Sequence, residues 1–372
     1  MRSISTSHAS RAGEETVRNT GKLDPLVDPA EFGVVRRSLV RFDDRPDGTL
    51  EMTMGCSMPI ECRLDSTGSV GRTNVNNAMK VLPDLYELCS GVLPGYDVHV
   101  AIGIFGDCRD QFVLNRPQYE MEADKIVNQL SLMNPENGGW GNGHEDPQYG
   151  LFGGAYLVAA YANAIGLKRY DFTISDEPAQ PMLSEGQLTR IFGPEVFAKC
   201  RTNGFNIDPN DLPTTNEVVQ DLLKQAHAFF LQFGAQYHNT NSFWVDLMGP
   251  ERVVQVPRIE VVPQMQAVIV GLTEGTLALD QVPDFLVEQK LDRDVIKQIQ
   301  RSVANIPIGA QVPLRQAIID AGHEIPKAGD VFRVKPDVFS RENLWPLTAE
   351  ELAELPAVEV TDDSPVISDD WL

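Results

Sequence analysis

Polar and apolar residues alternate along residues 59–65, a pattern typical of a β-strand. Ile60, Cys62 and Leu64 share one face under a period of two, and the strand runs into Asp65. The segment Ser66-Thr67-Gly68-Ser69-Val70-Gly71 then brings hydroxyl groups and two glycines. Because glycine permits tight turns, we expect the side chains of Asp65, Thr67 and Ser69 to converge on one point.

Three oxygen side chains on one turn provide part of the shell of a hard cation. Mg²⁺ prefers six oxygen ligands and keeps some waters or takes a ligand from another segment. The turn after residue 65 therefore indicates a partial magnesium site that needs a contribution from elsewhere in the chain.

The same hydrophobic pattern predicts further elements along the chain. A hairpin is expected over 34–54, buried strands over 98–106, 170–175 and 252–257, and a short edge strand over 111–114. Helices are expected over 74–93, with a kink or a division into two shorter helices at Pro83, and over 120–133, 149–165, 216–233, 265–279 and 283–303.

A second strand also ends on an acid, since Tyr170–Ser175 runs directly into Asp176. Strands that alternate with helices indicate right-handed crossover units and a parallel sheet. In such a sheet the carboxyl ends of the strands lie at one edge, where ligands bind. The sequence thus predicts an α/β fold with a doubly wound, mostly parallel sheet, helices on both faces, an N-terminal hairpin and a flexible acidic C-terminal tail.

Three segments together resemble von Willebrand factor A (VWA) domains. Asp65-Ser66-Thr67-Gly68-Ser69 resembles the Asp-x-Ser/Thr-Gly-Ser signature that opens the metal-ion-dependent adhesion site (MIDAS) of that family. Ser175-Asp176 resembles its third segment, with Glu177 in place of a glycine. The glycine-rich loop 134–149 resembles its second segment but has no threonine, so Asn142, Glu145 and Asp146 are the weaker second-loop candidates. Alternatively, Glu145 and Asp146 lie near a helix N-terminus, where their negative charges interact favourably with the helix dipole.

The resemblance implies a protein-binding module that depends on Mg²⁺ or Mn²⁺ and is not an enzyme. By resemblance, Thr67 and Ser69 coordinate the ion directly, and Asp65 and Asp176 hold it directly or through water. The ion then captures an Asp or Glu carboxylate of a protein partner. In intracellular relatives the partner is often an AAA+ ATPase or an assembly component. By analogy, the resemblance implies a partner of this kind for the present chain.

Two other classes of function stay open at this point. A haloacid dehalogenase-like phosphotransferase would use Asp65 as nucleophile, but such soluble enzymes carry an acid two residues later, where this chain has Thr67. A metal-free structural or scaffold protein with the same fold, such as a virion protein, is the other alternative.

Composition and charge limit the classes of partner that we expect. The chain of 372 residues carries a net charge of −22, which disfavours nucleic acid and membrane surfaces as partners. Its five cysteines form no Cys-x-x-Cys pair, and neither a leader nor a long apolar run is present, so we expect a cytoplasmic protein.

We expect three parts along the chain. Residues 1–33 form a flexible arm and residues 34–305 the VWA-like domain. Residues 306–372 form an extended, acidic, largely disordered tail in which Arg341 is the only Lys or Arg after residue 336. This tail suggests that Asp369 or Asp370 competes for the metal site within the same chain.

Overall fold

Six strands form the central sheet in the order β10-β9-β8-β4-β5-β6. The computed structural model describes residues 11–31, 36–37, 42–44, 50–52, 56–135, 145–234, 240–327 and 332–334. The strands are parallel except for β6, which pairs antiparallel with β5 at one edge. Their bounds are β4 (Ser57–Asp65), β5 (Asp97–Phe105), β6 (Leu114–Asn115), β8 (Arg169–Ser175), β9 (Ala226–Phe233) and β10 (Val253–Val256).

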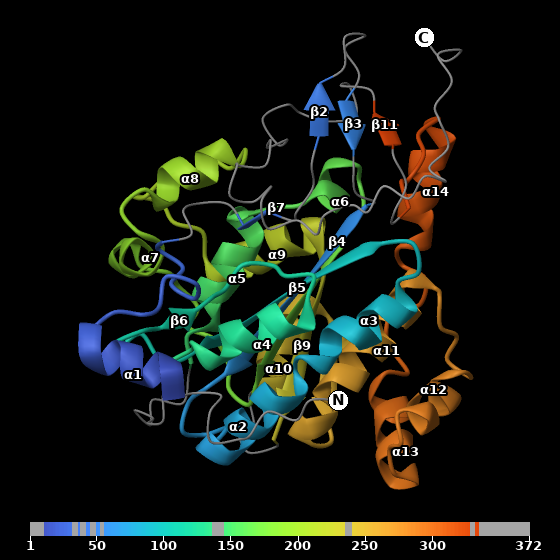
Figure 1. The fold of residues 1–372 in the computed structure, drawn as a ribbon, viewed down its shortest axis with the longest axis horizontal. Coiled ribbons are helices and arrows are strands. Elements are labelled where there is room, and N and C mark those ends of the chain that lie inside the picture. Colours follow the sequence, from blue (N-terminus) through green and yellow to red (C-terminus); the bar gives the residue numbers. More distant parts are fainter. Residues whose placement is uncertain are drawn as a thin grey trace, which may run out of the picture.

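Helices cover both faces of this sheet, and each face has its own hydrophobic core (Figure 1). One core includes residues of α2 (Arg72–Val81), α3 (Asp84–Val92), α4 (Ala123–Ser131), α11 (Val262–Glu274), α12 (Val282–Glu288) and α13 (Arg293–Ser302). The other includes α5 (Pro147–Tyr156), α7 (Glu185–Phe192), α8 (Val196–Thr202), α9 (Thr215–Gln225) and α10 (Thr240–Met248). The predicted doubly wound α/β fold is therefore confirmed, and the strand order is VWA/Rossmann-like.

The strand order reverses between β4 and β8. From β4 the chain builds outward through β5 to β6, and it then returns to the other side of β4 to add β8, β9 and β10. In open α/β sheets the crevice at the carboxyl ends of the two strands flanking such a reversal is the usual ligand site. Asp65 ends β4, and Asp176 follows β8, so the two predicted acids lie at this reversal.

The face of β4 and β8 toward α5 is polar although it is buried. Arg116 donates two hydrogen bonds to Glu61 at 2.6 and 2.8 Å, and Arg63 pairs with both Glu61 and Asp171. Burial alone would raise the pKa of Glu61, but Arg116 and Arg63 hold it well below its ordinary value. A strand of alternating polarity is thus buried on both faces, because its charged side chains form ion pairs with neighbours of opposite charge.

Glycines in α5 make room for these charged side chains. A Cβ at Gly150 would lie 2.5 Å from Arg63 Cδ, and a Cβ at Gly153 would lie 3.1 Å from Arg116 Nη1. At Gly154 it would lie 3.0 Å from an Asp171 carboxylate oxygen. The glycine-rich sequence of α5 therefore sets the close approach of this helix to the sheet.

Smaller elements lie at the ends and edges of the sheet. The predicted N-terminal hairpin is confirmed as β2 (Phe42–Asp44) and β3 (Leu50–Met52), which form a three-stranded sheet with β11 (Phe332–Val334) at the top of Figure 1. β1 (Arg36–Arg37) pairs with β7 (Val158–Ala159). The remaining elements are α6 (Tyr161–Ala164), α14 (Val312–Asp320) and the 3₁₀ turns Pro250–Arg252 and Ile259–Val261.

Three predicted helices are wrong in part. The helix predicted over 283–303 is two helices, α12 and α13, separated by residues 289–292. The helix predicted over 216–233 ends at Gln225, and the chain continues as the central strand β9. The helix predicted over 149–165 ends at Tyr156, where β7 and α6 follow. The break predicted at Pro83 is confirmed, because α2 and α3 are separate helices on either side of it.

The chain is more ordered than predicted on both sides of the domain. Residues 11–31 lie in the predicted arm, yet they include α1 (Arg11–Thr20) and the buried Leu23 and Val27. Residues 306–327 lie in the predicted tail, yet Gln311 is buried and its Oε1 lies 2.9 Å from His227 Nε2. The acidic segment from residue 335 to the end, with Asp369 and Asp370, lies outside the described residues.

Candidate metal centre

The turn after β4 is built around the Asp65 carboxylate. Its Oδ1 accepts hydrogen bonds from the Thr67 backbone N–H at 2.9 Å and from Thr67 Oγ1 at 2.6 Å. A side chain that binds the backbone two residues later closes a turn of this kind. Ser66 Oγ fixes the turn to the neighbouring strand by donating to the Phe105 carbonyl at 2.9 Å.

A row of hydroxyl groups joins this turn to the end of β8. Thr67 Oγ1 lies 3.1 Å from Ser69 Oγ, and Ser69 Oγ donates to Asp176 Oδ1 at 2.9 Å. On the other side, Ser175 Oγ donates to Asp65 Oδ2 at 2.5 Å. The structure therefore brings together Asp65, Thr67, Ser69 and Asp176, which are 111 residues apart at most in the sequence.

The second loop contributes Glu145. Its backbone N–H donates to the Pro178 carbonyl at 3.1 Å, which fixes the loop beside the chain that follows β8. Glu145 is 5% exposed, and its Oε2 has no hydrogen-bond partner in the described part of the chain. Burial, followed by the charges of Asp65 and Glu177, raises the pKa of Glu145 to about 10, while Thr67 opposes this by hydrogen bonding.

The other two second-loop candidates differ from Glu145. Asp146 lies at the N-terminus of α5, but its carboxylate is turned toward the loop after β5 and the Gln148 side chain. Its Oδ2 accepts from the Cys108 backbone N–H at 2.6 Å, and its Oδ1 accepts from Gln148 Nε2 at 2.5 Å. Asn142 lies outside the described residues.

The acids at this edge are buried without compensating positive charge. Across the described ranges, no lysine or arginine forms an ion pair with Asp65, Glu145 or Asp176. Burial raises the pKa of Asp65 to about 7 against the hydrogen bonds from Ser175 and Thr67, and it also raises the pKa of Asp176. Carboxylates in such surroundings favour either a proton or a cation.

The donor set fits a hard divalent cation. The hydroxyls of Thr67 and Ser69 and the carboxylates of Asp65, Asp176 and Glu145 are all oxygen ligands, which Mg²⁺ and Mn²⁺ prefer. The unpartnered, buried Glu145 Oε2 is an orphan acceptor that a cation would satisfy.

Several polar residues at this edge were not among the predicted metal ligands. Ser175 binds Asp65, and Asp107 and Glu177 are buried there with exposures of 2% and 4%. Asp107 follows β5 in the segment Phe105-Gly106-Asp107, as Asp65 ends β4. An acid after a buried strand was the signal that indicated Asp65 and Asp176, and the same signal would have found Asp107.

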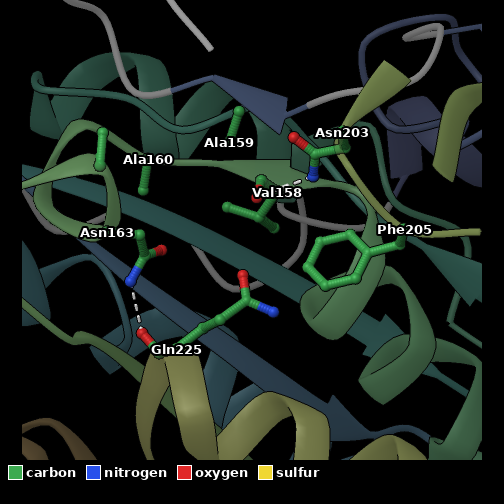
Figure 2. Close-up of a pocket in the computed structure, with 8 residues that line it drawn as sticks. Val158, Ala159, Ala160, Asn163, Asn203, Phe205 and Gln225 are labelled. Carbon is green, nitrogen blue, oxygen red and sulfur yellow. Dashed lines mark hydrogen bonds between the residues drawn. The ribbon is translucent and has the colours of Figure 1, made fainter. Parts of the chain in front are cut away.

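A pocket of about 240 Å³ lies at the opposite edge of the sheet, at the start of β9 (Figure 2). Small apolar side chains and the amides of Asn163, Asn203 and Gln225 line it together with Phe205. None of the described residues that line it is charged, so its chemistry differs from that of the acidic edge.

Comparison with solved structures gives two proteins that are distantly similar to this chain. No protein-family model and no curated protein matches the sequence. Proximal thread matrix protein 1 from the mussel byssus matches with a TM-score of 0.38 and 10% identity, over 58% of this chain and 48% of that one. A second structure of that protein, with a zinc-occupied MIDAS motif, has a TM-score of 0.35.

The pilus adhesin SpaC from Lactobacillus rhamnosus GG matches with a TM-score of 0.38 and 12% identity, over 63% of this chain and 34% of that one. This chain thus spans about half of the mussel protein and a third of the adhesin. None of the helices in the described ranges has the length and apolar character that a membrane crossing requires. At these TM-scores the similarities carry no argument about function, which has to come from the chemistry of the site.

Proposed function

We propose that the acidic edge of the sheet is a Mg²⁺- or Mn²⁺-dependent protein-binding site, and that the protein is not an enzyme. The observation that carries this proposal is the row of oxygen atoms of Asp65, Thr67, Ser69 and Asp176, which lie in contact with one another and join two strand ends where the strand order reverses. Glu145 adds a buried, unpartnered carboxylate oxygen beside it.

The proposed division of roles follows from exposure and charge. Thr67 and Ser69 are neutral donors, and Ser69 is exposed, so a cation held by them stays accessible from solvent. Asp65, Asp176 and Glu145 supply the negative charge that retains it. A cation with neutral hydroxyls among its ligands keeps enough positive charge to attract an Asp or Glu carboxylate of a protein partner. An AAA+ ATPase or an assembly component is the class of partner that we propose by analogy.

The geometry of Asp65 argues against the phosphotransferase alternative. Its side chain is 0% exposed, and both carboxylate oxygens accept hydrogen bonds, from Thr67 and from Ser175. A nucleophilic carboxylate has to reach the phosphorus atom of a substrate. Nothing in the described part of the chain specifically favours a metal-free scaffold over a metal site.

Calorimetric titration with Mg²⁺ and Mn²⁺ tests the metal site. We expect binding to the full chain and a loss of affinity in Asp65→Ala and Ser69→Ala. Removal of the buried Asp65 side chain can affect folding, and a misfolded variant would lose affinity for that reason alone. The exposed Ser69 is therefore the position at which a loss of affinity reports on the metal site itself. Absence of cation affinity in the folded wild-type chain would refute the proposal.

Capture of a carboxylate needs a second measurement. Short peptides with a fixed central Asp, compared with the same peptides carrying Asn, serve as probes against immobilised protein in Mg²⁺ or in EDTA. We expect retention of the Asp peptides in Mg²⁺ only. Equal retention of both sets, or Asp65-dependent hydrolysis of an aryl phosphate, would contradict the proposed function.

A further inference from the structure

The loop after β5 holds a second group of potential metal ligands. A carboxylate oxygen of Asp107, the thiol of Cys108 and a carboxylate oxygen of Asp146 all lie within 4.8 Å of one another. Asp107 and Asp146 are buried, with exposures of 2% and 1%, while Cys108 is half-buried. This group differs in chemistry from the group Asp65, Thr67, Ser69 and Asp176, because it contains a sulfur atom.

Hydrogen bonds fix this group in place. The Asp107 backbone N–H donates to Asp110 Oδ2 at 2.7 Å, and Asp107 Oδ1 accepts from the Arg109 backbone N–H at 2.8 Å. Arg190 Nη2 donates to the Cys108 carbonyl at 2.9 Å and so ties the loop to α7. Each of these carboxylate oxygens has a second lone pair, so the bonds orient the ligands without using up their capacity.

The Gln148 side chain provides a second observation, independent of the three ligands, that points to a bound group at this position. Its side chain is 0% exposed, and its Nε2 donates to Asp146 Oδ1, so the amide group lies against the group of ligands. Its Oε1 is buried and has no hydrogen-bond partner in the described part of the chain. Buried acceptors are normally satisfied, so this unpartnered oxygen, on the same amide group whose Nε2 contacts Asp146, indicates that the surroundings of Asp146 are incomplete without a further group.

We propose that Asp107, Cys108 and Asp146 form a second divalent-cation site, selective for a borderline-soft ion such as Zn²⁺. Thiolate and carboxylate ligands together favour Zn²⁺, whereas Mg²⁺ takes oxygen ligands alone. Binding transfers the thiol proton to solvent, so the ion meets two carboxylates and a thiolate.

This inference does not rest on the proposed protein-binding function, because its ligands are different residues. Titration of the metal-free full chain with Co²⁺ tests it through the sulfur-to-cobalt charge-transfer band, which reports thiolate ligation. We expect the band in wild type and in Ser69→Ala, and its loss in Cys108→Ser. Loss of the band in Ser69→Ala as well would contradict a separate site.

Alkylation of the folded chain provides a second readout, because the other four cysteines, Cys56, Cys62, Cys89 and Cys200, are buried. We expect excess iodoacetamide to modify Cys108 only slowly in metal-free protein, because burial and the neighbouring charges of Asp146 and Asp107 raise the pKa of its thiol to about 12. Zn²⁺ but not Mg²⁺ should slow this modification further, by about tenfold or more. In the double variant Asp107→Asn/Asp146→Asn the protection should disappear. Labelling that Zn²⁺ leaves unchanged, or protection that persists in the double variant, would overturn the proposal.

Discussion

Ser69 Oγ donates a hydrogen bond to Asp176 Oδ1 over 2.9 Å, although 107 residues separate the two in the sequence. The same Oγ lies 3.1 Å from Thr67 Oγ1, which in turn donates to Asp65. Ser69 is therefore the link between the two strand ends. Since it is exposed while its partners are buried, it is the position at which the site can be altered with the least effect on the fold.

We expect Ser69→Ala to weaken Mg²⁺ binding by about tenfold, or ~1.4 kcal/mol, because one neutral oxygen ligand is lost. The free energy of unfolding of the metal-free chain should fall by about 1 kcal/mol, because the buried Asp176 carboxylate loses the hydrogen bond that Ser69 donates. Calorimetry and urea unfolding measure the two quantities. Ser131→Ala is the matched control, since the Ser131 hydroxyl binds the Asn128 carbonyl at the end of α4. An unchanged Mg²⁺ affinity in Ser69→Ala would exclude Ser69 as a ligand.

The two acids of the site were predictable because a simple rule places them. Each follows a strand with an apolar face, Ile60 to Leu64 before Asp65 and Tyr170 to Ile174 before Asp176, and parallel strands end at one edge. Glu145 was named only as one of three second-loop candidates. Its position depends on the pairing of the loop with the Pro178 carbonyl, a long-range contact that no local pattern encodes.

The misassigned helix shows the limit of periodicity. Residues 226–233, Ala-His-Ala-Phe-Phe-Leu-Gln-Phe, are mostly apolar, so a helical stripe and a strand buried on both faces fit them equally well. The structure resolves this through the partners of each face. Phe229 and Leu231 pack in one core, while Ala228 and Phe230 pack in the other. Pairing with β8 on one side and β10 on the other therefore decided the outcome.

Glu145→Gln should have opposite effects on stability and on metal binding. The pKa of Glu145 in the folded protein, about 10, lies above its ordinary value, so its contribution to stability is present below about pH 4 and is lost as the pH rises toward 10. A neutral amide avoids this loss. We expect the metal-free variant to gain on the order of 1 kcal/mol at pH 8.

Metal affinity should fall in the same variant, because a carboxylate is replaced by a neutral group. Urea unfolding in EDTA and Mn²⁺ calorimetry measure the two effects. Glu122→Gln, at an exposed carboxylate before α4, is the control and should change neither quantity. A variant that loses stability in EDTA and binds Mn²⁺ as wild type does would show that Glu145 is structural.

Gly150→Ala in α5 should be strongly destabilising. The new Cβ would lie 2.5 Å from Arg63 Cδ, and Arg63 cannot move freely because it pairs with Glu61 and Asp171 in the buried face of the sheet. Overpacking of this kind costs about 1–3 kcal/mol, and a displaced buried ion pair costs more. Thermal and urea unfolding measure the loss.

Gly91→Ala in α3 is the matched control for this helix effect. No atom lies within 4 Å of the added Cβ, so the higher helix propensity of alanine should leave stability unchanged or raise it by up to about 1 kcal/mol. If both variants were equally stable, α5 would not lie as close to the charged side chains of the sheet as the structure has it.

Acid should destabilise the fold through two buried histidines. Burial lowers the pKa of His227 to about 4 and that of His99 to about 3, so both are neutral in the folded protein. Their stabilising contribution is present above the unfolded pKa of about 6.5 and is lost as the pH falls, by up to about 1.4 kcal/mol per pH unit for each group. Urea unfolding between pH 7 and pH 4.5, in steps, measures this slope.

The variant His227→Gln isolates one of these contributions. Glutamine can still donate to Gln311 Oε1, which lies 2.9 Å from His227 Nε2, but it does not titrate. The stability difference between wild type and His227→Gln should therefore shrink or reverse as the pH falls below about 6.5. Other titrating groups, including Asp65 and Glu145, contribute equally to both proteins and cancel in this difference. A difference that stays constant from pH 7 to pH 4.5 would mean that His227 is protonated or solvated in the folded state.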